Sequence, residues 1–425
     1  MDIYVVEQGE TISSIAESYG VSVNRLIQEN ELRDPDNLVT GQTIVITYPE
    51  ETHTVQEGDT LEGIAERYNI SVIQLYRNNS FLIEREYIYP GEVLVIRYDY
   101  EEKVSTIGYA LPFINDRILR KTLPYLTYLF VYNYRLAMNG EVETFYDDQN
   151  IVDLSKAYGT LPIMLVTTLT ARGTPNVQAA YEILLNEEIQ DQLVENILQI
   201  LREKGYYGFN MTFLYLTEAN EELYNNFTRR VTRRLSDEGY LVFVTADPGI
   251  RVIENDISFI RINFITIGRE VDGISFLSYL FGASVMPPAP VSSIANLTVY
   301  LDYVSTMVSS KKIFAGIQII AYNWELPYVA GFSRANSLTI SGAVELARDV
   351  GAVIQFDEVS QTPYFEYVRE DRQHIVWFID ARTIDSLTDL ITAKNFNGPS
   401  VWNIMDYYAQ LWLVINSKYE IEKLI

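Results

Sequence analysis

Residues 186–245 read NEEIQDQLVENILQILREKGYYGFNMTFLYLTEANEELYNNFTRRVTRRLSDEGYLVFVT. Apolar side chains recur at three- and four-residue steps over residues 186–204 and 221–237, which predicts two amphipathic helices. Each helix is followed by a short apolar run, at residues 208–215 and 240–245, which predicts a buried strand. Because strands alternate with helices in this way over about 320 residues, the expected fold of the larger part of the chain is an α/β fold, the (β/α)8 barrel.

The other predicted strands complete this barrel, which spans residues 104–425. A further helix is predicted at residues 298–309. Between the last two strands, the pieces AVIQFDE and HIVWFID alternate as strands do, and they predict a small α+β insertion at residues 350–382, packed on the barrel rim. The remaining predicted strands lie at residues 105–109, 125–132, 163–168, 259–267, 313–320 and 400–404.

Two copies of one sequence pattern precede the barrel. In each copy a short strand, two helices and a closing strand are predicted, and Thr60 can cap the first helix of the second copy. Repetition at a constant spacing indicates two small domains of order β-α-α-β, at residues 1–49 and 50–98. The residues that recur 49 positions later are Gly9, Thr11, Ile15, Ala16, Tyr19 and Asn30, as Gly58, Thr60, Ile64, Ala65, Tyr68 and Asn79.

The composition excludes several classes of function. The chain has 425 residues and a net charge of −25, which repels nucleic acids and anionic membrane surfaces. It has no cysteine and only two histidines, so no metal site and no cofactor are predicted. No apolar run is long enough for a membrane helix. The N-terminus lacks the pattern of a secretory signal, so synthesis without a signal peptide is expected.

The repeats resemble LysM domains. The markers are GDTL at residues 58–61, IAERY at 64–68, and the closing runs GQTIVI and PGEVLVI. LysM domains bind glycans that contain N-acetylglucosamine, such as peptidoglycan and chitin. The resemblance implies a glycan groove between the strand–helix turn and the loop before the last strand, although these residues could also be turn formers only. The implied groove residues are Gly9, Glu10, Thr11, Asn37 and Leu38 in the first copy, and Gly58, Asp59, Thr60, Tyr89 and Pro90 in the second.

The rest of the chain resembles the glycoside hydrolase family 18 barrels that follow tandem LysM domains in spore-cortex lytic enzymes of the SleL/YaaH type. Together with the repeats, this resemblance covers essentially the whole chain. It is carried by the order and spacing of several segments. These are LTYLFVYNYRLAMNGEV at 126–142, GYYGFN at 205–210, AYNWELPY at 321–328, QTPYFEYV at 361–368, VWFIDARTI at 376–384 and NGPSVWNI at 397–404.

The residues that carry the family's chemistry are altered in this chain. Active members have Asp-x-Glu on the fourth strand, where the glutamate protonates the glycosidic oxygen and the aspartate orients the substrate N-acetyl group. Thr212 and Leu214 occupy these positions, and strand alternation places both on the same side as Asn210. None of the three can deliver a proton at neutral pH. The Tyr-Asp pair expected at the end of the sixth strand aligns with Ile265 and Thr266.

The tryptophan that floors the sugar site in the family is kept as Trp402. Two other acids are candidates for a substitute proton donor, Glu218 after the fourth strand and Asp247 at the end of the fifth. Asp147 and Asp148 lack the spacing of a calcium loop and are expected on a solvated surface.

Three classes of function remain open. The first is a noncatalytic protein of the spore envelope that binds peptidoglycan or a related glycan. The second is a structural component that assembles with itself, with the barrel as a building block. The third is an active N-acetylglucosaminidase that uses an unrecognised acid. The resemblance implies synthesis in the mother-cell cytoplasm and deposition on the spore envelope, at the coat or the cortex surface.

Overall fold

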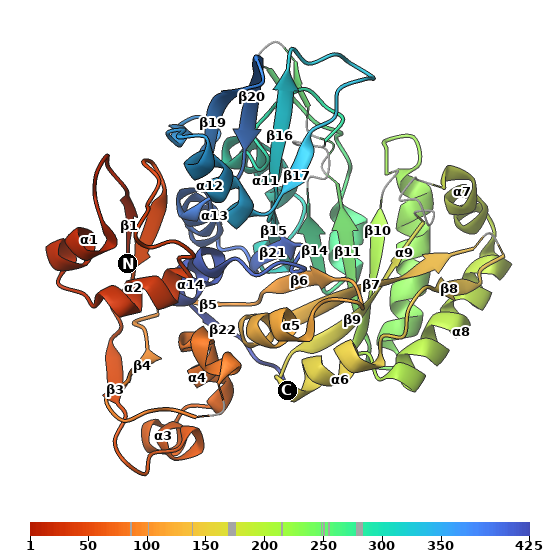
Figure 1. Ribbon diagram of the computed structural model, residues 1–425. Coiled ribbons are helices and arrows are strands. Elements are labelled where there is room, and N and C mark those ends of the chain that lie inside the picture. Colours follow the sequence, from red (N-terminus) through yellow and green to blue (C-terminus); the bar gives the residue numbers. More distant parts are fainter. Residues whose placement is uncertain are drawn as a thin grey trace.

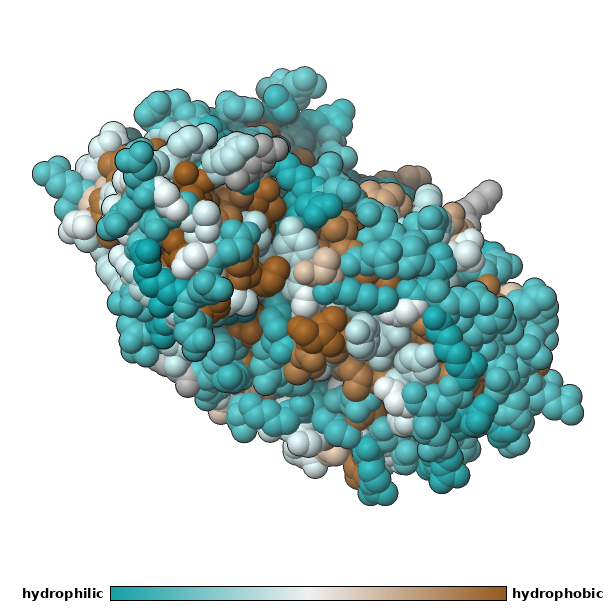
Figure 2. All heavy atoms as spheres, turned by 90° about the horizontal axis from the view of Figure 1, so that it is seen from below, coloured by the Kyte–Doolittle hydropathy of each residue, from teal (hydrophilic) through white to brown (hydrophobic). Residues whose placement is uncertain are grey.

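The computed structural model describes all residues except 86, 101, 138, 169–175, 214–215, 248, 250, 254–255 and 278–283. Two small N-terminal units lie side by side against one flank of a barrel, and a separate antiparallel sheet stands beside one end of the barrel strands (Figure 1). The underside of the molecule is mostly hydrophilic, with apolar side chains gathered in a few places (Figure 2). No described helix has both the length and the apolar character needed to cross a membrane.

Eight parallel strands form a closed barrel, as the sequence predicts. In each neighbouring pair the strands run parallel, and β6 also pairs with β7, which closes the ring. The strands in chain order are β6 (Ile107–Ala110), β7 (Tyr128–Leu136), β9 (Leu161–Thr167), β10 (Gly208–Phe213), β11 (Leu241–Ala246), β14 (Gly273–Phe276), β15 (Ile313–Gln318) and β21 (Gly398–Trp402). A short strand, β8 (Val142–Thr144), extends β7 as a hairpin.

The sixth barrel strand is not where the sequence predicts it. Residues 259–267 do not form a barrel strand, and the short helix α10 (Ile265–Glu270) begins within this segment. The segment follows a hairpin of β12 (Arg251–Ile253) and β13 (Asp256–Ser258), and the true strand, β14, has only four residues. The prediction failed because the apolar residues of this segment alternate as in a strand but pack on the outer core of the barrel. They are Ile262, Phe264 and Ile267.

Helices cover the outside of the barrel. The long helix α8 (Glu187–Lys204) begins where the sequence predicts, because the Asn186 side chain accepts hydrogen bonds from the backbone N–H groups of residues 188 and 189. Helix α11 (Ile294–Ser305) begins one turn earlier than predicted, because Ser293 caps it. The others are α5 (Asp116–Thr122), α6 (Gln149–Ala157), α7 (Val177–Leu185), α9 (Glu221–Ser236), α13 (Ala381–Lys394) and α14 (Ala409–Lys418).

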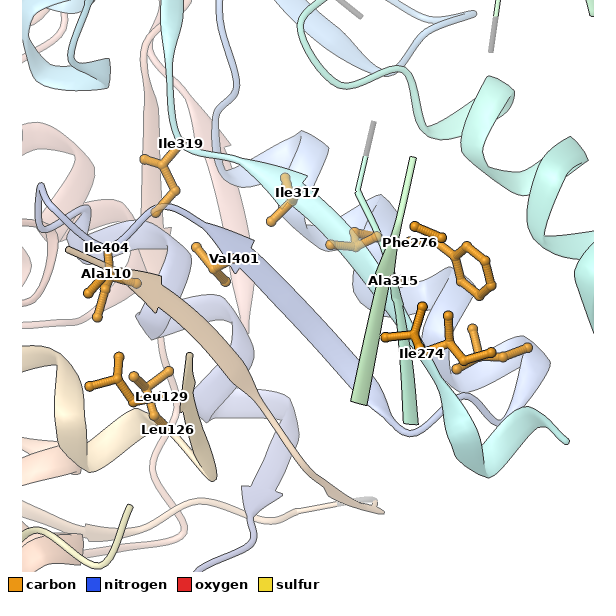
Figure 3. Packing of buried hydrophobic residues seen from close by; sticks show 14 of the residues in the cluster. Ala110, Leu126, Leu129, Ile274, Phe276, Ala315, Ile317, Ile319, Val401 and Ile404 are labelled. Carbon is orange, nitrogen blue, oxygen red and sulfur yellow. The ribbon is translucent and has the colours of Figure 1, made fainter. Parts of the chain in front are cut away.

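Successive residues of each barrel strand face two different cores. On β15, Phe314 lies in the core inside the barrel, whereas Ala315 and Ile317 lie in the core between the barrel and its helices. Figure 3 shows this outer core, where Ile274 and Phe276 of β14 and Ala315 of β15 lie close together. The inner core is rich in aromatic rings and fills the barrel, so a ligand site inside the ring of strands must lie at its mouth.

The insertion between β15 and β21 is larger than predicted. Five antiparallel strands form it, and it begins at residue 321 rather than near residue 350, because β16 pairs with β20 across the sheet. Its elements are β16 (Ala321–Leu326), β17 (Asn336–Leu338), α12 (Ile340–Asp349), β18 (Gln355–Asp357), β19 (Thr362–Arg369) and β20 (Arg372–Trp377).

Each N-terminal unit has the predicted β-α-α-β order. In both copies an asparagine near the end of the second helix ties that helix to the closing strand. Asn30 exchanges two 2.8 Å hydrogen bonds with the backbone of Val45, and Asn79 does the same with Val95. The elements are β1 (Asp2–Val5), α1 (Ile12–Tyr19), α2 (Val23–Asn30) and β2 (Thr43–Ile46), then β3 (Glu51–Thr54), α3 (Leu61–Tyr68), α4 (Val72–Asn78) and β4 (Val93–Arg97).

Both N-terminal units pack on helix α14 of the barrel domain. Gln410 donates from its amide to Thr43 O at 2.7 Å and accepts from the Thr43 hydroxyl at 2.9 Å. Asn416 donates to the Asn78 side chain of the second unit at 2.9 Å. Val45 of the first unit belongs to the same apolar core as the outer face of the barrel. The three domains are therefore joined by buried contacts.

Candidate functional site

A ladder of neutral polar side chains crosses the inside of the barrel. Asn210 on β10 is fully buried, and its Oδ1 accepts a 3.1 Å hydrogen bond from the Thr245 hydroxyl on β11. The Thr245 hydroxyl lies 2.8 Å from the Tyr109 hydroxyl on β6. Across the barrel, the hydroxyls of Ser275 on β14 and Ser400 on β21 lie 2.7 Å apart. Burial raises the pKa of Tyr109, so this residue also stays neutral.

The predicted catalytic strand ends directly above this ladder. Thr212 pairs in register with Thr245, and alternation along β10 puts it on the same side as Asn210. Its hydroxyl is buried and has no hydrogen-bond partner among the described residues. A threonine hydroxyl neither carries charge nor releases a proton at neutral pH. Leu214, the predicted replacement for the catalytic glutamate, lies outside the described residues.

The positions assigned to the Tyr-Asp pair need correction. Ile265 and Thr266 lie at the start of helix α10 and not at the end of the sixth strand. That strand ends at Phe276, so the residues that follow it in the chain are Leu277-Ser278-Tyr279-Leu280. Residues 278–280 lie outside the described part of the chain. The error came from assigning an apolar segment on the outside of the barrel to the sixth strand.

Trp402 lies at the end of the eighth barrel strand, as predicted. Its ring centroid lies 5.4 Å from that of Tyr109 and 5.9 Å from that of Tyr132 on β7. The ring is half-buried, and the peptide bond to Asn403 is cis. Burial raises the pKa of Tyr132. These three rings form an aromatic floor beside the polar ladder, and such a floor suits the apolar face of a sugar.

The two candidate substitute acids lie in different surroundings. Glu218 is exposed in the turn between β10 and α9. Asp247 follows β11 directly and accepts a 2.8 Å hydrogen bond from the backbone of Gly249. Neither carboxylate bonds to the Asn210–Thr245 ladder among the described contacts. A proton donor must reach the glycosidic oxygen at about 3 Å, so each acid would have to act from the rim.

Asp148 is buried, which the sequence did not predict. Only 1% of this residue is exposed, at the start of helix α6. Its carboxylate accepts hydrogen bonds from the Tyr134 hydroxyl and, at 2.6 Å, from the Tyr206 hydroxyl, and Lys204 lies at 3.1 Å. Burial, together with this carboxylate, raises the pKa of both tyrosines. Asp148 is thus fully engaged within the protein. The neighbouring Asp147 is exposed, as expected.

In the second N-terminal unit, the strand that leads to the Gly58 turn is hydrogen-bonded to the loop that contains Tyr89 and Pro90. Backbone hydrogen bonds of 2.8 Å join Val55 to Gly91 and to Glu92, so the loop before β4 lies beside the strand that leads to Gly58. Thr60 caps α3 by accepting from the N–H of residue 63. Tyr89 and Pro90 are exposed, and 58% of Tyr89 is accessible.

Asp59 holds this turn together. Its carboxylate accepts from the backbone N–H of Gln56 at 2.8 Å and lies 2.8 Å from Nε2 of the buried His53. Nδ1 of His53 lies 3.0 Å from the Tyr68 hydroxyl. The backbone hydrogen bond and His53 lower the pKa of Asp59. One of only two histidines in the chain therefore supports the predicted groove from below.

The equivalent loop of the first unit is attached to the barrel domain. The carbonyl of Asn37 accepts a 2.9 Å hydrogen bond from Arg348, and the carbonyl of Thr40 accepts one of 2.9 Å from the backbone of Ile354. On the other side of the groove, Glu10 accepts from the Tyr4 hydroxyl at 2.5 Å, which raises the pKa of Tyr4 to about 12. Gly9 and Thr11 are exposed, and Leu38 is half-buried. The two copies thus differ in how freely the groove loop is presented.

The described residues contain no group of three or more potential ligands that could hold a metal ion. At the described part of the barrel mouth, hydroxyl and amide groups offer hydrogen bonds, and aromatic rings offer faces for stacking. In the N-terminal units it is hydrogen bonding by backbone groups around a capped helix, beside an exposed tyrosine.

The fold is a closed (β/α)8 barrel with a polar, aromatic mouth, preceded by two β-α-α-β units. Comparison with known proteins identifies the class of protein that has this architecture. Residues 4–47 and 53–97 match the LysM domain family, and residues 106–406 match glycosyl hydrolases family 18. The second match covers more than half of the chain. The chain therefore belongs to glycosyl hydrolases family 18 and carries two LysM domains.

Its similarity to individual members extends over the full length. The chain is 32% identical to the cortical fragment-lytic enzyme of Bacillus subtilis (strain 168), over all of this chain and 99% of that protein. It is 25% identical to the putative sporulation-specific glycosylase YdhD of the same organism, over 97% and 98% of the two chains. The crystal structure of the Bacillus megaterium QM B1551 spore cortex-lytic enzyme SleL superposes with a TM-score of 0.82, at 27% identity and over 100% and 99% of the two chains.

Proposed function

We propose that this protein is a noncatalytic member of its family that binds peptidoglycan, or a related glycan containing N-acetylglucosamine, in the spore envelope. The single observation that carries the proposal is the neutral ladder at the barrel mouth. Where the family's chemistry needs an acidic strand end, Asn210 and Thr212 supply an amide and a hydroxyl. By alternation in the sequence, Leu214 is the next residue on the same side of the strand and is not acidic. The stretch Leu277–Leu280 after the sixth strand contains no acidic residue either.

Binding is assigned to the LysM domains, with the barrel mouth as a second sugar-binding surface. The exposed Tyr89 beside the Thr60 turn supports the first assignment, and the half-buried Trp402 supports the second. Two small binding units on one chain gain affinity through effective concentration. The matching relatives are named as cortical and sporulation-specific proteins, which supports location in the spore envelope.

The test is a hydrolysis assay on cortical peptidoglycan fragments, with an active cortical fragment-lytic enzyme as the positive control. The expected result is that no reducing ends are released by this chain, while it sediments with intact peptidoglycan. Release of reducing ends that Glu218→Gln abolishes would overturn the noncatalytic assignment. Absence of sedimentation, under conditions in which a known LysM protein sediments, would overturn the binding assignment.

The second candidate is an active glycosidase, which the names of the relatives favour because they describe lytic enzymes. In this case Glu218 or Asp247 would act as the acid from the barrel rim. The two proposals give opposite results in the same assay, and single Glu218→Gln and Asp247→Asn variants identify the acid.

Self-assembly into a structural layer is a further part of the proposal. The chain has no cysteine, so its assembly in the envelope cannot use disulfide bonds. Light scattering of the purified protein at high concentration, with and without peptidoglycan fragments, tests this part. A specific oligomer is the expected result, and a strict monomer in both conditions would contradict it.

A further inference from the structure

A cavity of about 670 Å³ lies where both LysM domains meet the barrel domain. Its walls come from all three domains, with Arg25 from the first LysM domain, Arg77 and Asn78 from the second, and Tyr407 and Asn416 from the barrel domain. This position is separate from the barrel mouth, and of the predicted groove residues of the second LysM domain only Pro90 lines it. The cavity is large enough for a sugar or a short peptide.

Arg77 differs from the other charged residues that line this cavity. Arg25 forms a 2.7 Å ion pair with Glu29, and Glu92 pairs with Arg85. Arg77 is 96% buried by contrast, with a relative exposure of 4%, and no described carboxylate pairs with it. Its Nη1 donates to the carbonyl of Ile421 at 3.2 Å, and its Nε has no hydrogen-bond partner among the described residues.

The amine of Lys423 lies near Arg77. Lys423 is half-buried and donates to the carbonyls of Leu123 and Leu126, at 2.8 and 2.6 Å, and to the Thr160 hydroxyl at 2.9 Å. Burial, with a contribution from the charge of Arg77, lowers the pKa of Lys423. Lys423 is not among the residues that line the cavity, so Arg77 supplies the guanidinium there that no described carboxylate pairs with. An anion bound there would offset the cost of burying an unpaired guanidinium.

Asn416 supplies the complementary group. It is 2% exposed and lines the same cavity; its amide donates to Asn78, and its Oδ1 has no partner in the described part of the chain. A buried acceptor of this kind calls for an N–H or O–H donor. A ligand that suits both residues therefore carries a carboxylate for Arg77 and a hydrogen-bond donor for Asn416.

We propose that this cavity binds a carboxylate-bearing ligand with an adjacent hydrogen-bond donor. Two components of peptidoglycan have this chemistry, the lactyl group of N-acetylmuramic acid and the carboxylate of a short stem peptide. This inference rests on the proposed function in one respect, namely that the ligand comes from peptidoglycan. It adds a site for the acidic part of the polymer to the groove for N-acetylglucosamine.

The experiment uses the full-length protein and three probes, N-acetylmuramic acid, N-acetylglucosamine and an alanyl-glutamate dipeptide. The first two differ only in the lactyl ether, so a response to the first alone reports the carboxylate. Calorimetric titration and the shift in melting temperature measure binding, since a ligand stabilises the state that it binds. A response to N-acetylmuramic acid or to the dipeptide, with a weaker or no response to N-acetylglucosamine, is expected, and the stronger of the two identifies the source.

Two variants connect the response to the cavity. Arg77→Met is expected to weaken binding of the acidic probe about tenfold or more. Without ligand it should melt at or above the wild-type temperature, because an unpaired buried cation is replaced by an apolar chain. Asn416→Leu removes the acceptor and is expected to weaken binding as well. Arg234→Met, on helix α9 where Arg234 pairs with Glu195, is the matched control and should bind as wild type does.

Equal affinity of Arg77→Met, Asn416→Leu and the control for the acidic probe would overturn the inference, and so would absence of any response to both acidic probes. If Arg77→Met fails to fold, Asn416→Leu decides the outcome. Binding of chitin oligosaccharides serves as the separate readout for the proposed function. It should be unchanged in both cavity variants, so loss of one activity without the other shows which proposal has failed.

Discussion

At the scale of single residues, the inside of the barrel shows how neutral polar side chains from different strands bond to one another. Asn210, Thr245 and Tyr109 are joined by hydrogen bonds inside the barrel, and the Nδ2 of Asn210 has no partner among the described residues. Neutral groups that pair in this way avoid the large cost of burying an unpaired carboxylate. The described part of the barrel interior is therefore built from neutral polar groups and aromatic rings.

The first prediction concerns the restoration of the acids. The double variant Thr212→Asp, Leu214→Glu is expected to release no reducing ends from cortical fragments, because the stretch after β14 still lacks its acid. It should also melt at a lower temperature than the wild type, since a carboxylate replaces the buried Thr212 hydroxyl.

The control is Thr212→Ser, which keeps a hydroxyl and should leave the melting temperature close to that of the wild type. Hydrolysis by the double variant at a rate near that of the positive control would contradict the prediction. It would mean that the two positions on the fourth strand were the only defect in the site.

The second prediction concerns Asp59 and pH. Its pKa is lower in the folded protein than in the unfolded chain, chiefly through the Gln56 hydrogen bond and His53. The ionised carboxylate therefore stabilises the fold above the unfolded pKa of about 3.9, and this contribution is lost as the pH falls through the folded pKa. Asp59→Asn should unfold at a lower urea concentration than wild type at pH 7, with the difference shrinking below about pH 4.

The exposed Asp36, for which no hydrogen bond or ion pair is found among the described residues, provides the control as Asp36→Asn. Its urea midpoint should match that of the wild type at every pH. A difference between Asp59→Asn and wild type that stays constant from pH 7 to pH 2 would show that the carboxylate's charge is not responsible.

At the scale of elements, the loop before β2 decides how the first LysM domain is placed. Gly41 adopts φ +87°, and a Cβ atom there would lie 1.9 Å from the carbonyl oxygen of Ile354. Arg348 and Arg382 donate to carbonyls of the same loop, Asn37 and Gly41. The glycine thus permits a close approach of two backbones, one from each domain.

The third prediction concerns this close contact between the backbones of Gly41 and Ile354. Gly41→Ala should separate the loop from the segment around Ile354, because backbone atoms cannot yield to a new methyl group as a flexible side chain can. Hydrogen exchange at the Ile354 amide, which donates to Thr40 at 2.9 Å, should become faster. The matched control is Gly20→Ala, which has φ +65° but no neighbouring atom within 4 Å.

Both variants place an alanine at a positive φ and so carry the same kind of backbone strain. A difference between their exchange rates at Ile354 therefore reports only the clash of the new methyl group with the Ile354 carbonyl. Equal exchange at Ile354 in the two variants would contradict the assigned role of Gly41. The control also separates loss of docking from a general loss of stability in the first LysM domain.

At the scale of the whole molecule, the two LysM domains are not equivalent, although their sequences repeat. The groove loop of the first is hydrogen-bonded to the barrel domain, whereas Tyr89 and Pro90 of the second are exposed. An exposed aromatic ring beside a row of hydrogen-bonding groups is suited to a sugar face. The second domain is therefore expected to contribute more of the affinity for glycan.

The fourth prediction follows from this difference. In the full-length protein, Tyr89→Ala should weaken sedimentation with peptidoglycan several-fold, since it removes an exposed ring at the groove. Tyr48→Ala is the control, because Tyr48 is also exposed, at 48%, but bonds to Asp2 away from the groove. Equal binding by the two variants would remove Tyr89 from the binding surface.

The order of elements could be predicted from the sequence by itself, because it depends on local spacing. The 49-residue repeat predicted the two β-α-α-β units. The three- and four-residue spacing of apolar side chains over residues 186–204 predicted the helix that begins at its Asn186 cap. The sequence also identified Thr212 at the end of the fourth strand and Trp402 at the end of the eighth, since both follow from the position of a strand in the chain.

Only the tertiary structure decided features that depend on residues far apart in the chain. The sixth strand is β14 and not residues 259–267. The sequence misled because an apolar segment that packs on the outer core by one side has the same alternation as a strand. Asp148 is buried between Tyr134 and Tyr206, and Arg77 lies in a cavity formed by three domains, with no partner carboxylate among the residues that the structure describes. Such contacts join side chains up to several hundred positions apart, and local periodicity carries no information about them because packing alone brings these residues together.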